Sequence, residues 1–182
     1  MSVIDDILAY NTTFVEEKHY EEYTTDKYPD KKLAIVSCMD TRLTELLPAA
    51  LGLKNGDAKI IKNAGGVISH PFGSVIRSLL VGIFELGVDT IMVIGHTNCG
   101  AQHMNAEEMC SHMIKAGVPQ DHIDLMDYCG VDFEEWLAGF GDGEESVQHS
   151  VELIRNHPLI PETITVKGFI IDSVTGKLTE VA

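Results

Sequence analysis

The chain has 182 residues, of which 45% are hydrophobic and 23% charged, and its 28 acidic and 13 basic side chains give a net charge of −15. This composition excludes a disordered or collagen-like chain, and the length favours a single domain with a core of its own. A chain this acidic is not expected to bind nucleic acid or an anionic membrane surface, because both need a basic footprint.

The cysteines and the N-terminus predict a cytoplasmic protein. No apolar stretch approaches the roughly 20 residues of a membrane span, and the N-terminus lacks the basic and apolar regions of a secretory signal. In a reducing compartment, cysteines bind metals or act chemically more often than they form disulfides. We therefore expect reduced thiols at all four cysteines, which are Cys38, Cys99, Cys110 and Cys129.

The N-terminal segment, residues 1–32, predicts a helical arm. Apolar residues recur at helical spacing over residues 3–20, Ser2 is a candidate N-cap, and acidic side chains suit the first turn. The polar stretch that follows contains Pro29 and is typical of a connector.

Strand and helix patterns then alternate. Short apolar, β-branched runs predict four strands, at residues 33–37, 58–62, 90–94 and 163–171. Helical patterns lie between them, at residues 43–51 and 74–86. Residues 177–181 follow a Thr-Gly turn and predict an edge strand. The expected fold class is α/β, with a central, mostly parallel sheet of four strands, a short antiparallel edge strand and helices on both faces.

Residues 104–143 interrupt this alternation. Three methionines, Met104, Met109 and Met113, recur at helical spacing and are expected to fill a core. We expect a helical insertion that packs on one end of the sheet, within a single domain spanning residues 1–182.

Three side chains with metal-binding chemistry follow two of the predicted strands. Cys38 comes directly after the first strand, and His96 and Cys99 follow the third. Ligands bind at the carboxyl edge of such sheets, so these side chains are candidates for one site. Two thiolates and an imidazole suit Zn²⁺, and three protein ligands leave a fourth position open, as in catalytic zinc sites. The alternative is two small buried cysteines and a hydrogen-bonded core histidine.

The motifs Cys-x-Asp-x-Arg at residues 38–42 and Gly-His-Thr-x-Cys-Gly at residues 95–100 resemble the zinc signature of the β-class carbonic anhydrases. The similarity extends from residue 33 to residue 181 and is nearest to the compact prokaryotic branch. Three further stretches agree with it, at residues 63–66, 157–161 and 175–178. The resemblance implies a zinc lyase (carbonate dehydratase) that reversibly hydrates CO2 to bicarbonate and a proton. It also implies one Zn²⁺ per subunit and a homodimer as the smallest active unit, with a higher oligomer left open.

The resemblance implies a role for each residue of the two motifs. It makes Cys38, His96 and Cys99 the zinc ligands and makes Asp40 and Arg42 a catalytic dyad. In this reading Asp40 accepts the hydrogen of a zinc-bound hydroxide and orients it toward CO2, while a bidentate bond to Arg42 keeps Asp40 ionised. The alternative for this pair is an ordinary surface ion pair. Asp40 could also swing onto the zinc as a fourth ligand, which predicts a pH-dependent switch between an open and a closed site.

The substrate pocket is expected to be apolar, because CO2 has no charge. Gly65, Gly66 and Gly100 would let the backbone approach a small substrate closely. Val67 and Ile68 are candidates for the apolar wall. Part of that wall could come from a partner subunit.

The N-terminal arm is the expected partner contact. Its apolar residues, Ile4, Ile7, Leu8 and Phe14, would suit an isologous dimer interface.

Other functions remain open on the same residues. A zinc hydrolase of CS2 or COS would use the same site, and a non-catalytic zinc-binding homologue would keep the ligands without the reaction. An enzyme with Cys38 as nucleophile is disfavoured, because Cys-x-x-x-Arg is too short for a phosphate-cradling loop and Asp40 would repel phosphate.

Overall fold

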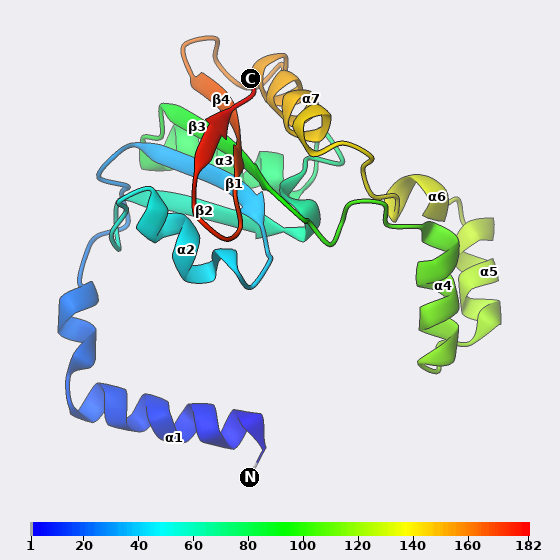
Figure 1. Cartoon of the computed structure of the whole chain (residues 1–182), viewed down its shortest axis with the longest axis horizontal. Helices are drawn as coiled ribbons and strands as arrows, with labels where there is room; N and C mark the ends of the chain where they lie inside the picture. The colour runs from blue at the N-terminus through cyan, green and yellow to red at the C-terminus, as the bar shows by residue number, and fades with distance from the viewer. Residues whose placement is uncertain (1) are drawn as a thin grey trace.

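The computed structural model describes residues 2–182, and its first helix stands away from the rest of the chain (Figure 1). Helix α1 spans Val3–Glu16. Ser2 caps it reciprocally: its hydroxyl accepts a hydrogen bond from the Asp5 backbone, and the Asp5 carboxylate accepts one from the Ser2 backbone. The helix ends earlier than residue 20 because Lys18 adopts a left-handed φ of 59°, and a short 3-10 helix, η1 (His19–Tyr23), follows.

Five strands form a single sheet in the order β2-β1-β3-β4-β5. Their bounds are β1 (Leu33–Cys38), β2 (Ala58–Asn63), β3 (Thr90–His96), β4 (Thr165–Ile171) and β5 (Leu178–Glu180). The first four strands pair in parallel, and β5 pairs antiparallel with β4. The predicted fold class, a mostly parallel sheet with a short antiparallel edge strand, is confirmed.

Helices cover both faces of this sheet (Figure 1). The three that pack on it are α2 (Leu43–Ala50), α3 (Ser74–Leu86) and α7 (Gly143–Arg155). Successive residues of a strand point to opposite faces, so β1 contributes to two separate cores. Ile35 is buried in a cluster with Leu47 of α2. Val36 is buried in the other cluster, with Ile76 of α3 and Val151 of α7.

The inserted segment is helical, as predicted, but its helices extend to one side of the sheet (Figure 1). They are α4 (Ala106–Lys115), α5 (Gln120–Tyr128) and α6 (Phe133–Trp136). The expectation that they pack on the end of the sheet is wrong, since α4 and α6 mainly contact each other and α5 has no buried residue. The three methionines are half-buried rather than part of a core. Only Phe140, at the end of the insertion, packs against the cluster under α2.

Across residues 2–182, every helix falls short of the length and apolar character that crossing a bilayer would require.

A glycine allows the turn after β2 to lie against the end of β1. This turn is the 3-10 helix η2 (Ala64–Gly66). Gly66 has a left-handed φ of 68°, and a Cβ atom there would lie 2.8 Å from the backbone nitrogen of Cys38. The backbone of β1 cannot move aside to relieve this contact, whereas a flexible side chain could. Gly66 therefore helps to fix the backbone at the end of β1, where the first candidate ligand lies.

Replacing Gly66 with alanine should destabilise the protein by about 2 kcal/mol or more, because the left-handed conformation and the backbone contact both oppose a Cβ. Gly52→Ala is the matched control, since Gly52 has a φ of 64° but nothing within 4 Å of its Cβ position. The control should lose only the conformational part, about 1 kcal/mol. Urea unfolding measures both variants, and equal losses would contradict a steric role for Gly66.

Candidate metal centre

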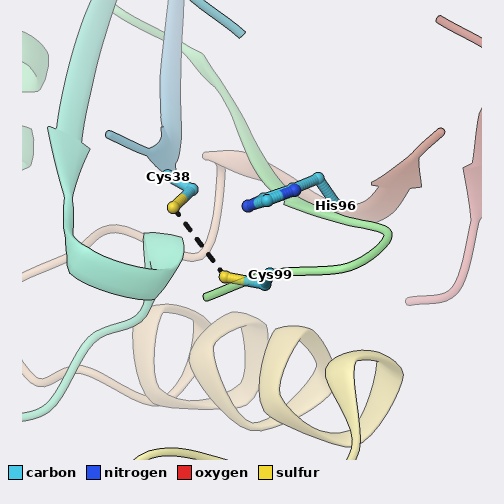
Figure 2. Close-up of side chains that lie close together, drawn as sticks. All are labelled: Cys38, His96 and Cys99. Carbon is cyan, nitrogen blue, oxygen red and sulfur yellow. Dashed lines mark hydrogen bonds between the residues drawn. The ribbon is translucent and has the colours of Figure 1, made fainter. Parts of the chain in front are cut away.

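The carboxyl ends of β1 and β3 bring Cys38, His96 and Cys99 together (Figure 2). Cys38 and His96 are the last residues of their strands, and the pairing of Ser37 with Ile94 places the two ends at the same edge. Cys99 lies in the loop that follows β3. The two Sγ atoms are 3.9 Å apart, and one ligand atom from each of the three residues lies within 4.8 Å of the others. All three side chains are buried.

The loop after β3 turns back toward β1 through a left-handed residue. Asn98 has a φ of 52°, a conformation that asparagine tolerates better than most residues with a Cβ. This turn directs Cys99 toward Cys38 (Figure 2).

The imidazole of His96 is oriented for metal binding. Its Nδ1 atom lies 3.0 Å from the carbonyl oxygen of Thr97, which can only accept, so Nδ1 carries the hydrogen. The Nε2 atom is therefore left with a lone pair, and it is buried without a hydrogen-bond partner anywhere in residues 2–182. A buried acceptor without a donor destabilises a fold by about 1–3 kcal/mol, and a bound cation removes that penalty.

Burial acts on both kinds of ligand. It lowers the pKa of His96 and raises the pKa of Cys99, whose thiol also lies beside the thiol of Cys38. The neutral imidazole is the form that binds a metal. The thiols bind as thiolates, and a divalent cation between them compensates the two negative charges. The residues present thus fit Zn²⁺.

Asp40 and Arg42 form a bidentate ion pair beside these three residues. The Nε and Nη2 atoms of Arg42 donate to the two carboxylate oxygens of Asp40 at 2.9 and 2.7 Å, and the Arg42 backbone nitrogen donates at 2.9 Å. These hydrogen bonds hold the pKa of Asp40 well below its usual range, so the carboxylate is ionised. Its Oδ2 atom lies 3.9 Å from Nε2 of His96. The pair therefore faces the candidate ligands, which distinguishes it from an ordinary surface ion pair.

Arg42 makes two further contacts that the sequence did not indicate. Its Nη2 atom donates to the carbonyl oxygen of Asn98 at 2.8 Å, and its Nη1 atom donates to the hydroxyl of Ser173 at 3.2 Å. Ser173 lies 131 residues further along the chain, so no local motif links it to Arg42.

A cleft of about 380 Å³ opens onto the site. It is lined by Cys38, Met39, Asp40, Thr41, Ala64, Gly65, Gly100, Ala101 and Met104. Gly65 and Gly100 were expected there, whereas Gly66 lies against the backbone of β1 and Val67 is not part of the lining. Ile68 is buried in the core between the sheet and α3. The apolar wall comes instead from Ala64, Ala101 and Met104, which lie in loops and turns. Of these three residues, helical spacing singled out only Met104, and it was expected in a core rather than in the cleft.

A family model described as "Carbonic anhydrase" matches residues 33–178. The chain belongs to the carbonic anhydrase family. Its class is the β class, as the sequence motifs predicted: the crystal structure of β-carbonic anhydrase isoform I from Trichomonas vaginalis is similar, with a TM-score of 0.91 and 36% sequence identity over 100% of this chain and 98% of that one.

The relatives include proteins named for each of the two reactions considered above. A Bacillus subtilis protein named "Putative carbonic anhydrase YtiB" is 51% identical over 178 residues, which are 98% of this chain and 95% of the relative. A carbon disulfide hydrolase from Acidithiobacillus thiooxidans is 31% identical over 157 residues, which are 82% of this chain and 76% of the relative.

Removing either candidate thiolate ligand should abolish zinc binding. Zinc per subunit, measured by elemental analysis of the purified protein, should be about one in the parent chain and near zero in Cys38→Ser and Cys99→Ser. Cys110→Ser is the matched control, because Cys110 is a free, half-buried thiol on α4 outside the cluster. Full zinc content in Cys38→Ser, or its loss in Cys110→Ser, would contradict the assignment.

Proposed function

We propose that this protein catalyses the reversible hydration of CO2 to bicarbonate and a proton at a Zn²⁺ site formed by Cys38, His96 and Cys99. The observation that carries this proposal is the buried, unpartnered Nε2 atom of His96 beside two thiols, on a cleft that Asp40 also lines. Family membership supports the reaction, and the donor set supports the metal.

When bound, Zn²⁺ supplies the Lewis acidity that makes water a nucleophile near neutral pH. The chain's own groups orient that nucleophile. An ionised carboxylate can only accept hydrogen bonds, so Asp40 accepts the O–H of the attacking water or hydroxide and leaves a lone pair to face CO2. Arg42 keeps Asp40 ionised and fixes the carboxylate plane through its two parallel hydrogen bonds.

The cleft suits an uncharged linear substrate. Ala64, Ala101 and Met104 offer apolar surface, and Gly65 and Gly100 leave space without a side chain. These groups offer water few hydrogen-bond partners, which favours an uncharged molecule in this part of the cleft.

We further propose that Asp40 can serve as a fourth zinc ligand in a closed state. The carboxylate lies near His96, but Arg42 binds both of its oxygens, so closing the site would break at least one of these bonds. Crystal structures over a range of pH values test this idea, and water on the zinc throughout would contradict it.

Hydrolysis of CS2 is the second candidate, because one relative with 31% identity is named a carbon disulfide hydrolase. CS2, like CO2, is linear and uncharged, and the same residues would act on it. Parallel assays of CO2 hydration and of H2S release from CS2 distinguish the two. Faster turnover of CS2 would overturn the assignment of CO2 as the principal substrate.

We also propose a homodimer in which α1 contacts a second copy of the chain. Helix α1 has no buried residue, and Ile4, Ile7 and Leu8 are 64%, 62% and 59% exposed. A helix with such a face is expected to bury it against another surface. Pairing of dimers into a higher oligomer, a cytoplasmic location and a single domain stay predictions.

Asp40→Asn should retain zinc and lose catalysis. The amide has the same shape but no charge, so it holds neither Arg42 nor the nucleophile in the same way, and kcat/KM for CO2 should fall about 100-fold or more. Stopped-flow CO2 hydration measures the rate, and elemental analysis measures the zinc. Asp89→Asn is the control, because Asp89 forms an exposed ion pair with Lys32 away from the cleft. An Asp40→Asn enzyme of normal rate would contradict the proposed role.

Ile7→Glu should convert the dimer to a monomer, because it places a charge in the apolar face of α1. Ala9→Glu adds the same charge on the opposite side of the helix and should leave the dimer intact. Sedimentation velocity measures both proteins. A parent chain that sediments as a stable, active monomer would contradict the dimer.

A further inference from the structure

The turn between β4 and β5 reaches the Asp40–Arg42 pair from a different part of the sheet. Ser173 lies in this turn, two residues after the end of β4, and is only 5% exposed. Its hydroxyl oxygen accepts a hydrogen bond from Nη1 of Arg42 at 3.2 Å. A buried serine so placed is available to hold the guanidinium.

The hydroxyl of Ser173 uses all of its hydrogen-bonding capacity. It donates to the carbonyl oxygen of Thr97 at 3.2 Å and lies 3.1 Å from the Thr97 hydroxyl. The Thr97 hydroxyl in turn accepts from the Ser173 backbone nitrogen at 3.0 Å, so its own hydrogen is free to be donated to Ser173. A hydroxyl has one hydrogen and two lone pairs, and the two contacts with Thr97 together with the one from Arg42 satisfy all three. The orientation of Ser173 is therefore fixed by Thr97, which follows His96 directly.

The turn that carries Ser173 is held independently of Arg42. The Asp172 carboxylate accepts hydrogen bonds from the backbone nitrogens of Val174 and Thr175 at 3.0 and 2.7 Å, and from the Thr175 hydroxyl at 2.9 Å. Gly176 has a left-handed φ of 75°, and a Cβ there would lie 2.9 Å from the Cβ of Ala50. The turn is thus seated on α2, the helix that begins directly after Arg42.

Arg42 needs such support because its side chain is 42% exposed. Water can compete for its donors, and a guanidinium held by Asp40 alone could move together with that carboxylate. The four side-chain bonds of Arg42 go to three separate segments: two to Asp40, one to Asn98 and one to Ser173. The last two anchor the guanidinium to the ends of β3 and β4.

We propose that Ser173, oriented by Thr97, is a positioning residue that fixes the guanidinium of Arg42 and through it the carboxylate of Asp40. This inference rests on the proposed function, in which Asp40 orients the nucleophile. Catalysis depends steeply on such alignment, so a small shift of the carboxylate lowers the rate without removing a catalytic group. The proposal also gives a role to the Thr-Gly turn between β4 and β5. This turn is one of the stretches that resemble the β-class carbonic anhydrases, but none of its residues takes part in the proposed reaction directly.

Ser173→Ala tests this directly in the zinc-loaded enzyme. Zinc content should be unchanged, and kcat/KM for CO2 should fall about tenfold, as expected for the loss of one hydrogen bond to a charged group. Thr97→Val and Thr97→Ser form a matched pair that leaves Ser173 in place. The first removes the supporting hydroxyl and should lower the rate, whereas the second keeps it and should stay within about twofold of the parent.

A double-mutant cycle separates positioning from a general structural role. In an Arg42→Gln background, Ser173→Ala should cause no further loss of rate, because the group that it positions is already gone. A merely structural serine would lower the rate by the same factor in both backgrounds.

A readout that does not depend on turnover is the Nε–H signal of Arg42 in ¹⁵N NMR spectra, assigned by its loss in Arg42→Gln. The Nε–H hydrogen should exchange slowly with solvent in the parent and in Thr97→Ser, and faster in Ser173→Ala and Thr97→Val.

An unchanged catalytic rate and an unchanged Nε–H signal in Ser173→Ala would overturn the inference. If Ser173→Ala does not fold, the two Thr97 variants decide by the same criteria. A parent enzyme that does not hydrate CO2 would overturn the proposed function instead, while the NMR comparison would still report on Arg42.

Discussion

The arrangement depends on one constraint: a neutral imidazole and two thiols are held together, away from water, at the edge of a parallel sheet. Parallel pairing brings the ends of β1 and β3 to one edge, and the turn after β3 returns Cys99 toward Cys38. Without a cation, His96 keeps an unpartnered buried nitrogen there. A soft or borderline divalent ion resolves this, since it accepts the lone pair of the imidazole and compensates two thiolates.

The surrounding polar groups form layers around this cluster. Asp40 faces His96, Arg42 binds Asp40, and the ends of two other strands bind Arg42. Asp40 and Arg42 are more exposed to solvent than the cluster, but Arg42 is bound by Ser173, which is as buried as the cluster and lies in a capped turn. In the proposed reaction these groups align the nucleophile, because a small, uncharged substrate offers the protein almost nothing to hold.

Much of the fold could be predicted from local patterns. Apolar, β-branched runs located four of the five strands, the position after the Thr-Gly turn located the fifth, and the helical pattern at residues 74–86 coincides with α3. The motif spacing also located the three residues that the structure brings together. What could not be predicted depends on distant contacts. Ser173 meets Arg42 across 131 residues, and the wall of the cleft comes from loop and turn residues, of which only Met104 belonged to a periodic pattern. The insertion was expected on the sheet because its methionines suggested a core, yet its helices extend away from it.

X-ray absorption at the zinc edge of the purified enzyme measures directly which atoms surround the metal. The structure predicts two sulfur ligands at about 2.3 Å and one imidazole nitrogen at about 2.0–2.1 Å, with the remaining ligand a light atom. A shell without sulfur, a shell of four sulfurs, or a protein that takes up no zinc would contradict this account.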